Sequence, residues 1–168
     1  MSVQQVDKPS LSKSSSDIDY ALIVENSVQV LITGDKELIP AYAKAGDAGA
    51  DLRASESGSI APGQRTLIPT GIRIALPDGY VGLVHPRSGL AVKNGVTVLN
   101  TPGTIDSGYR GEIKVTLLNT SDEEFSYQRG DRIAQLVVQK YEKAEFLEVE
   151  QLPETERGDG GFGSSGRK

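Results

Sequence analysis

The chain of 168 residues contains no cysteine, no tryptophan and a single histidine. Without cysteine, the protein has no disulfides, no cysteine-ligated zinc and no thiol chemistry. A single histidine argues against a histidine-rich metal site and against a serine–histidine–aspartate triad chosen among several histidines. No apolar run approaches the roughly 20 residues that a membrane-spanning helix needs, so we expect no membrane partner.

Basic residues are also scarce relative to acidic ones. The 18 lysines and arginines face 23 aspartates and glutamates, which gives a net charge of −5. Proteins that coat nucleic acids usually carry a basic surplus, so we expect no nucleic-acid partner. The first residues show no basic region followed by an apolar stretch, so they do not predict a secretory signal. We therefore expect a soluble, intracellular protein of the cytoplasm.

Glycine, by contrast, is abundant, with 19 residues in the chain. From residue 27 onward, short runs rich in Val, Ile, Leu and Thr alternate with turn signals, at spacings near ten residues. This pattern predicts an all-β sandwich or barrel. The predicted strand runs are SVQVLIT (27–33), RTLIPTGIRIAL (65–76), YVGLVH (80–85), VTVLN (96–100), EIKVTLLN (112–119), RIAQLVVQKY (132–141) and EFLEVEQL (145–152).

The length fits one domain flanked by two segments of different composition. Residues 1–25 are rich in Ser, Lys, Asp and Gln, and they cannot bury enough apolar surface to offset the entropy of ordering. We therefore predict a disordered N-terminal arm (1–25), a β domain (26–153) and a flexible, glycine-rich C-terminal segment (154–168). Because the core of such a domain is small, oligomerisation is a reasonable supplement to its stability.

Two aspartates, Asp47 and Asp51, lie four residues apart around a glycine in the stretch DAGADL (47–52). Their carboxylates can turn toward a cation. Alternatively, they form an Asx-type turn before a strand. Both interpretations stay open from the residues alone.

The second motif is HPRSG (85–89), where a predicted strand ends at a proline. The following stretch SGLAVKN (88–94) predicts a short helical turn, with Ser88 as its N-cap and Gly95 as its stop. An arginine, a hydroxyl and free N–H groups at a helix start form an anion site. The alternative is a salt bridge plus a helix cap, and His85 is interpreted as a packing or surface residue.

The third motif, NTPGTIDSGYRG (100–111), lies between two predicted strands and therefore predicts a hairpin. Asp106 and Tyr109 are three residues apart across a Ser-Gly turn. A carboxylate and an aromatic ring at a hairpin tip can face one small molecule, beside exposed main-chain hydrogen-bonding groups. The alternative is a purely structural turn, in which the aspartate side chain bonds its own backbone and the tyrosine ring packs over the turn.

The fourth motif is RGDRIAQL (129–136). Strand alternation places Gln135 on the same face as Ile133 and Val137. An unpaired buried amide costs about 1–3 kcal/mol, so Gln135 needs a hydrogen-bond partner. The Arg-Gly-Asp triplet predicts a turn rather than an adhesion signal.

The fifth motif is the glycine-rich stretch RGDGGFGSSG (157–166). It has glycines spaced as in a Walker loop, but it lacks the lysine and the flanking strand and helix that such a loop requires. A glycine-rich chain with Arg and Ser can still wrap phosphates with its N–H groups. The alternative is a plain flexible tail.

Together, in this order along one small β protein, the five motifs resemble those of the trimeric deoxyuridine triphosphatase (dUTPase) family. The residues within the motifs are most similar to those of actinobacterial members. The resemblance covers residues from about 40 to 166. It is carried by DAGADL (47–52), PRSGLA (86–91), NTPGTIDSGYRGE (100–112), RGDRIAQL (129–136) and RGDGGFGSSG (157–166).

The resemblance implies a jelly-roll β fold and a homotrimer whose three active sites are shared between subunits. It also implies hydrolysis of dUTP to dUMP and pyrophosphate with Mg²⁺, by attack of water at the α-phosphate. This reaction limits uracil incorporation into DNA and supplies dUMP for dTMP synthesis.

The resemblance further implies roles for residues of the hairpin. Asp106 is expected to orient and activate the attacking water and to hold the 3′-OH of deoxyribose. Tyr109 is expected to pack under the sugar and to leave no room for a 2′-OH. The uracil edge is expected to be read by the side chain of Asn100 and the main chain of Gly103, Thr104 and Ile105.

For the phosphates, the resemblance implies that Arg87, Ser88 and Gly89 act from a neighbouring subunit. Gln135 is expected to bond the α-phosphate region or the water, and Lys114 is a further substrate contact. Asp51 would hold a water on Mg²⁺, which itself sits mainly on the substrate phosphates. The C-terminal lid would contribute Arg157 to the γ-phosphate, Phe162 to stack on uracil, and Gly163, Ser164 and Ser165 to wrap phosphate.

Two other functions remain to be weighed. A dCTP deaminase has the same fold and similar motifs, but that family places a catalytic glutamate where this chain has Thr116, counted from Gly111. A non-catalytic β-sandwich binding module would need all five motifs to be structural. The joint presence of Asp106, Tyr109, Arg157 and Phe162 argues against that second alternative.

Overall fold

The computed structural model describes residues 27–156 and residue 158. Within this part of the chain lie eleven strands and one α-helix, and every strand pair is antiparallel. The predicted all-β fold is therefore confirmed. The predicted N-terminal arm (1–25) lies outside the described residues, and so does most of the C-terminal segment. No helix within the described residues has the length and hydropathy needed to cross a membrane.

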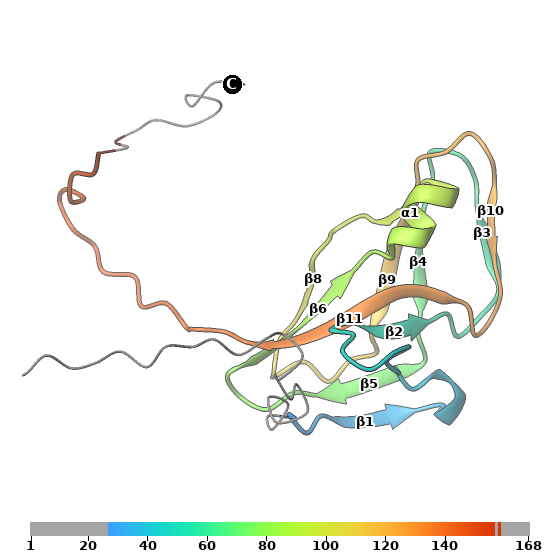
Figure 1. The fold of residues 1–168 in the computed structure, drawn as a ribbon, viewed down its shortest axis with the longest axis horizontal. Coiled ribbons are helices and arrows are strands. Elements are labelled where there is room, and N and C mark those ends of the chain that lie inside the picture. Colours follow the sequence, from blue (N-terminus) through green and yellow to red (C-terminus); the bar gives the residue numbers. More distant parts are fainter. Residues whose placement is uncertain (1–26, 157, 159–168) are drawn as a thin grey trace, which may run out of the picture.

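Two larger sheets form the body of the domain, and two small sheets complete it (Figure 1). One larger sheet has the order β2-β11-β6-β8, and the other has the order β4-β9-β7. The small sheets are the pairs β1-β5 and β3-β10. The strands are β1 (Leu31–Gly34), β2 (Ala50–Arg53), β3 (Gly58–Ile60), β4 (Arg65–Pro69), β5 (Ile72–Ala75), β6 (Tyr80–His85), β7 (Val96–Val98), β8 (Gly103–Ile105), β9 (Lys114–Asn119), β10 (Phe125–Tyr127) and β11 (Arg132–Lys140).

The hydrophobic core joins side chains of both larger sheets in one cluster. Leu52 and Val84 come from the four-stranded sheet, and Ile68, Val115 and Leu117 come from the three-stranded sheet. In strand β9, the buried side chains alternate with more exposed ones, as expected for a strand that covers a core on one face. The inner faces of the two sheets are therefore fixed by close packing.

The chain between β7 and β9 connects the two larger sheets. β7 and β9 form the predicted hairpin, with Val98 opposite Leu117. Between them, β8 leaves this sheet and pairs with β6 of the other one, with Gly103 opposite Val84. The long hairpin connection thus spans the gap between the two sheets, and it carries the third sequence motif.

The one α-helix of the described residues, α1 (Ser88–Asn94), has the predicted bounds, and a short 3-10 helix, η3 (Lys36–Leu38), follows β1. Gly95 ends it with a left-handed φ of 64° and donates its N–H to the carbonyl of Ala91, as expected for a glycine stop. The prediction of Ser88 as the N-cap is wrong. Arg87 is the N-cap, in an extended conformation after Pro86, and it makes no side-chain capping bond.

Three strand predictions need correction. The run 65–76 is not one strand, because the chain turns at Gly71, where φ is +72° and only glycine fits easily. The run 27–33 becomes a strand only at Leu31. Residues 145–152 form no strand within the described part of the chain, and Phe146 there is 93% exposed.

Four short strands were not predicted, namely β2, β3, β8 and β10. Each has only three or four residues. Their sequences carry too few alternating positions to stand out from the turns around them. Two of these strands, β2 and β8, carry predicted site residues, as the site geometry makes clear.

Candidate active site in two clefts

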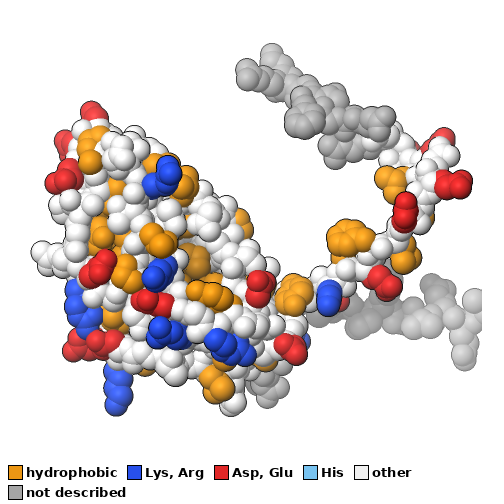
Figure 2. All heavy atoms as spheres, turned by 180° about the vertical axis from the view of Figure 1, so that it is seen from behind, with side chains coloured by type: hydrophobic (Ala, Val, Ile, Leu, Met, Phe, Trp, Pro, Cys, Tyr) orange, Lys and Arg blue, Asp and Glu red, His pale blue; other side chains and the backbone are white. Residues whose placement is uncertain are grey.

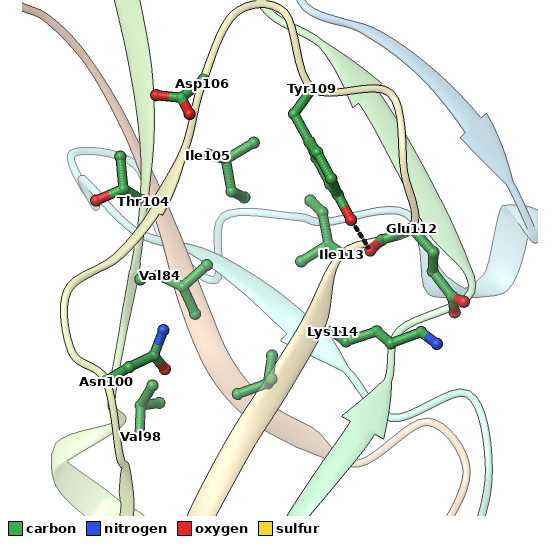
Figure 3. A pocket seen from close by; sticks show the side chains of 12 residues that line it. Val84, Val98, Asn100, Thr104, Ile105, Asp106, Tyr109, Glu112, Ile113 and Lys114 are labelled. Atoms are coloured by element: carbon green, nitrogen blue, oxygen red, sulfur yellow. Dashed lines mark hydrogen bonds between the residues drawn. The ribbon is translucent and has the colours of Figure 1, made fainter.

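A cavity of about 170 Å³ opens beside the hairpin connection between β7 and β9. We call it the hairpin cavity. It lies between the two larger sheets, since β6 and β8 contribute one wall and β9 contributes the other (Figure 3). Its lining residues are Val84, Val98, Asn100, Gly103, Thr104, Ile105, Asp106, Tyr109, Glu112, Ile113, Lys114 and Val115.

The apolar side of the hairpin cavity is part of the core. Val98, Val115 and Ile113 are each at most 2% exposed, and Val84 is 5% exposed. Since these side chains pack in the core cluster, their positions are set by the fold. The cavity therefore offers a rigid apolar surface with a few polar groups at its edge, which is typical of a small-molecule site.

Asp106 and Tyr109 occupy one end of this cavity, and Asn100 occupies the other (Figure 3). The predicted turn is confirmed, because the N–H of Tyr109 donates to the carbonyl of Asp106 at 3.0 Å. The hydrogen bonds of the described residues include none to the Asp106 carboxylate, so the alternative of an aspartate that bonds its own backbone has no support. The Asp106 carboxylate and the Tyr109 ring, which is 45% exposed, are therefore both available to a ligand.

The tyrosine ring has fixed neighbours. Its hydroxyl donates to the carbonyl of Glu112 at 2.9 Å (Figure 3). At Gly111, a Cβ would lie 2.5 Å from Cζ of the Tyr109 ring, so only glycine lets the ring lie where it does. The Arg110 guanidinium donates to the carbonyls of Ser107 and Tyr109 and closes the turn on itself. Sequence reasoning assigned no role to Arg110 or Glu112.

A second cleft, of about 390 Å³, lies on the outer face of the four-stranded sheet. We call it the arginine cleft. It shares no lining residue with the hairpin cavity. Its lining residues are Ala43, Asp47, Ala48, Gly49, Asp51, Arg87, Ser88, Gly89, Gln135 and Val137.

Asp51 is the charged centre of the arginine cleft. Its carboxylate lies 3.1 Å from Nε of Arg87 and 3.3 Å from Nη1 of Arg132. The Asp51 side chain is only 13% exposed, whereas those of Arg87 and Arg132 are 26% and 44% exposed. Arg87 also donates to the carbonyl of Arg132 at 3.2 Å. Sequence reasoning missed Arg132, although it immediately follows the predicted Arg-Gly-Asp turn.

Asp47 has a different environment from Asp51. Its carboxylate accepts the backbone N–H of Lys44 at 2.8 Å, and its own N–H donates to the Lys44 carbonyl at 3.2 Å, so Asp47 closes a local turn before strand β2. Asp51 instead lies in strand β2 and pairs with arginines. The described residues contain no group of three or more His, Asp or Glu side chains that would hold a metal ion.

Gln135 has the hydrogen-bond partner that its position requires, since its Nε2 donates to the carbonyl of Pro86 at 3.0 Å. It shares the outer face with Val137, as predicted, but not with Ile133, which is 1% exposed in the core. The error has a physical cause. A register shift between Arg132 and Ala134 interrupts the alternation of β11. The Arg-Gly-Asp triplet forms the predicted turn, with the Asp131 N–H donating to the Gln128 carbonyl.

The two clefts divide the predicted site residues between them. The hairpin cavity holds Asn100, Gly103, Thr104, Ile105, Asp106, Tyr109 and Lys114. The arginine cleft holds Asp51, Arg87, Ser88, Gly89 and Gln135. The predicted lid residues Arg157, Phe162, Gly163, Ser164 and Ser165 lie outside the described residues. Thr116, where a deaminase would have its glutamate, pairs with Leu67 in the β4–β9 ladder and does not line the hairpin cavity.

Comparison with known proteins matches this arrangement to one family. A model of the dUTPase family matches residues 35–166. The deoxyuridine 5′-triphosphate nucleotidohydrolase of the actinobacterium Thermobifida fusca is 59% identical over 129 residues, which are 76% of this chain and 72% of the relative. The sequence resemblance, including its actinobacterial character, is therefore confirmed.

Solved structures agree. A dUTPase of Staphylococcus bacteriophage 80alpha, in a structure with dUPNHPP, superposes with a TM-score of 0.75 at 28% identity, covering 82% of this chain and 98% of that one. A dUTPase of phage phi11 of S. aureus, whose structure is described as showing the coordination of a structural Mg(II) ion, has a TM-score of 0.68 at 25% identity, covering 77% and 100%. These likenesses also confirm the predicted jelly-roll fold. The chain belongs to the dUTPase family.

Proposed function

We propose that this chain hydrolyses dUTP to dUMP and pyrophosphate. The observation that carries the proposal is the division of the site into two clefts of different chemistry. One cleft combines a carboxylate, an aromatic ring and an amide around an apolar surface. The other combines an arginine, a hydroxyl and a glutamine with two aspartates. A nucleoside triphosphate has the same two parts, a base and sugar at one end and a chain of anionic phosphates at the other.

The nucleoside is assigned to the hairpin cavity. The Asn100 amide and the main chain of Gly103, Thr104 and Ile105 would read the hydrogen-bonding edge of uracil. The Tyr109 ring would pack under the deoxyribose and leave no space for a 2′-hydroxyl. The hairpin would likewise leave no room for a 5-methyl group on the base. A site that leaves polar groups unpaired or clashes with the wrong substrate can discriminate by several orders of magnitude, so we expect this site to reject UTP and dTTP.

The chemical step is assigned to Asp106. Its carboxylate would orient a water molecule, accept its proton as the water oxygen attacks the α-phosphorus, and also hold the 3′-OH of the sugar. The bond from the α-phosphorus to the bridging oxygen breaks, and pyrophosphate leaves in line. The absence of a hydrogen-bond partner for this carboxylate within the described residues supports its availability for that role. Catalysis of this kind depends mostly on positioning and charge stabilisation.

The triphosphate is assigned to the arginine cleft. Arg87 would donate to phosphate oxygens through its planar fork of N–H groups, and Ser88 and Gly89 would add a hydroxyl and a backbone N–H. Gln135 would bond the α-phosphate region or the attacking water. Lys114, which lines the hairpin cavity, would contact the substrate from the nucleoside side.

Mg²⁺ is proposed as the cofactor, and the carboxylates of the arginine cleft are the side chains that could hold it. Asp51 is one carboxylate flanked by two arginines, which is too few donors for a cage made of protein alone. Mg²⁺ usually keeps several waters and uses one or two carboxylates together with substrate phosphates, and this donor set fits that habit. Asp51 would therefore hold the ion through a water. When bound, Mg²⁺ neutralises charge on the phosphate oxygens.

A homotrimer with shared active sites is proposed because one chain keeps the two clefts apart. If the cavity of one subunit faces the arginine cleft of the next, each site is complete only in the assembly. Exposed apolar side chains support burial against other copies of the chain. They include Leu67 on β4, Leu99 after β7, and Phe146, Leu147 and Leu152 in the stretch after β11. Figure 2 shows hydrophobic side chains on the surface of one face of the molecule.

The glycine-rich C-terminal segment is proposed as a lid. Arg157 would pair with the γ-phosphate, Phe162 would stack on uracil, and Gly163, Ser164 and Ser165 would wrap the phosphates. Exclusion of water by such a lid strengthens the electrostatic interactions beneath it. These roles rest on the family resemblance of residues 157–166.

The test is pyrophosphate release from dUTP, UTP, dTTP and dCTP, each with and without Mg²⁺. We expect release from dUTP that is stimulated by Mg²⁺ and far slower release from the other three. Equal rates with UTP would contradict the assignment of Tyr109, and equal rates with dTTP would contradict that of the hairpin. Formation of a uracil nucleotide from dCTP would instead favour a deaminase.

A further inference from the structure

The wall of the hairpin cavity contains a glutamate, Glu112, that touches two segments at once. Its side-chain carboxylate accepts the backbone N–H of Gly71, from the turn between β4 and β5, at 2.8 Å. Its main-chain carbonyl accepts the Tyr109 hydroxyl at 2.9 Å. One residue therefore links the tyrosine ring to a turn more than thirty positions earlier in the chain.

The turn at Gly71, which donates to the Glu112 carboxylate, is itself held in place by hydrogen bonds to Ile113. Ile113 donates its N–H to the carbonyl of Ile72 at 3.0 Å, and its own carbonyl accepts the Thr70 hydroxyl at 2.6 Å. Thr70 and Ile72 are fully buried, and Ile113 is 2% exposed. These bonds fix the chain just after Glu112, and the carboxylate bond to Gly71 extends the attachment by one more residue toward Tyr109.

Other bonds of the turn do not provide this attachment. Arg110 donates to carbonyls of its own turn, so it closes the turn without connecting it to a sheet. The Ser107 hydroxyl donates to the Asp78 carboxylate at 3.2 Å, but this contact is solvent-exposed and does not involve the ring. In the described structure, the Tyr109 hydroxyl is hydrogen-bonded to Glu112. The position of the ring thus depends on where the Glu112 carbonyl lies.

We propose that Glu112 is a positioning residue that sets the selectivity of the site for deoxyribose over ribose. The proposal rests on the proposed function, in which Tyr109 packs under the sugar. Anchored by Gly71, Glu112 holds its carbonyl, and hence the Tyr109 ring, at the depth that excludes a 2′-hydroxyl. Without the Gly71 bond, the Glu112 peptide unit is held only through the Ile113 N–H, so its carbonyl and the Tyr109 ring gain freedom to move, and a ribose fits.

The test compares Glu112→Ala with Glu112→Gln in the full chain, using pyrophosphate release from dUTP and UTP. Alanine removes the acceptor for Gly71, and glutamine keeps a carbonyl oxygen in its place. For Glu112→Ala we expect kcat/KM for dUTP to fall about tenfold, chiefly through a higher KM, and the dUTP-over-UTP ratio to fall about tenfold, because a misplacement of 1 Å costs up to about 100-fold and the ring here shifts by less. Glu112→Gln should restore both values to near those of the unchanged chain.

The matched control is Glu124→Ala. Glu124 is another loop glutamate that accepts a hydrogen bond, from the Ser59 hydroxyl at 3.0 Å, and it lines neither cleft. We expect this variant to keep the dUTP-over-UTP ratio of the unchanged chain. A ratio that falls equally in the control would show a general loss of stability and would overturn the proposal.

An unchanged ratio in folded Glu112→Ala would also overturn it, and so would a Glu112→Gln variant that behaves like alanine. If Glu112→Ala fails to fold, Tyr109→Phe provides the second variant, since it removes the hydroxyl that bonds Glu112. A lower dUTP-over-UTP ratio in Tyr109→Phe supports the proposal, and an unchanged ratio contradicts it. If the unchanged chain releases no pyrophosphate from dUTP, the proposed function itself fails, and this inference fails with it.

Discussion

The hairpin cavity and the arginine cleft differ in the side chains that line them and in how deeply those side chains are buried. The hairpin cavity is walled by core side chains and by a turn whose backbone bonds are fixed. The arginine cleft lies on the outer face of a sheet, and its charged side chains are partly exposed. One cleft is defined by shape and the other by charge.

This difference indicates which property each cleft controls. A rigid apolar wall distinguishes substrates that differ by one methyl or one hydroxyl, because a misfit cannot relax. Partly exposed arginines can turn from Asp51 toward a phosphate and bind it strongly, but they discriminate little among triphosphates. We therefore expect changes in the hairpin cavity to alter selectivity and turnover, and changes in the arginine cleft to alter affinity.

The largest effect is expected for Asp106→Asn in the hairpin cavity. Asparagine keeps the size of the side chain but cannot accept a proton from water, so kcat should fall by about 10²–10⁴-fold. Binding of dUTP, measured by calorimetry with the inactive variant, should remain near that of the unchanged chain. A kcat within a few-fold of the original value would contradict the assigned role of Asp106.

A smaller effect is expected for Gly111→Ala, which tests the shape of the same cavity. The added Cβ would lie 2.5 Å from Cζ of Tyr109, so the ring must move. We expect kcat/KM for dUTP to fall about 100-fold, as is observed for small displacements of positioning groups. The control is Gly108→Ala, where an added Cβ meets no atom within 4 Å. Equal kinetics in the two variants would contradict a shape-defined cavity.

The smallest effect is expected for Gly49→Ala, the corresponding change in the arginine cleft. Here the added Cβ would meet the end of the Gln135 side chain, with the amide oxygen as the nearest atom and Cδ 3.0 Å away, and this side chain is partly exposed. Because this side chain can shift aside, we expect kcat/KM to fall only about threefold and the dUTP-over-UTP ratio to stay unchanged. A loss of selectivity as large as that of Gly111→Ala would remove the distinction between the two clefts.

The sequence predicted the hairpin turn that carries Asp106 and Tyr109 better than it predicted the short strands beside it. Asp106 and Tyr109 were predicted at a hairpin turn, and that turn is present because Ser-Gly chemistry and two flanking apolar runs are local signals. Strand β8, only three residues long, escaped prediction although it forms a wall of the hairpin cavity. Its place is fixed by pairing with β6, which no local pattern reveals.

The errors have related causes. The register shift in β11 moved Ile133 into the core against simple alternation. Arg132 and Glu112 were not predicted as site residues because their partners, Asp51 and Gly71, are 81 and 41 positions away in the chain. Contacts of this kind depend on tertiary structure, and a single sequence without an assembled fold does not indicate them.

The central claim is that the two clefts of one chain serve different active sites. It is tested by mixing two variants, Asp106→Asn in the hairpin cavity and Arg87→Ala in the arginine cleft, after joint unfolding and reassembly in equal amounts. At dUTP concentrations far below the raised KM of Arg87→Ala, each variant alone should be nearly inactive. If sites are shared between neighbouring subunits, random assembly leaves about one site in four with both clefts intact, and dUTP hydrolysis should recover to about a quarter of the original rate. Recovery of no activity above that of the separate variants, with mixed oligomers confirmed by mass spectrometry, would contradict the claim.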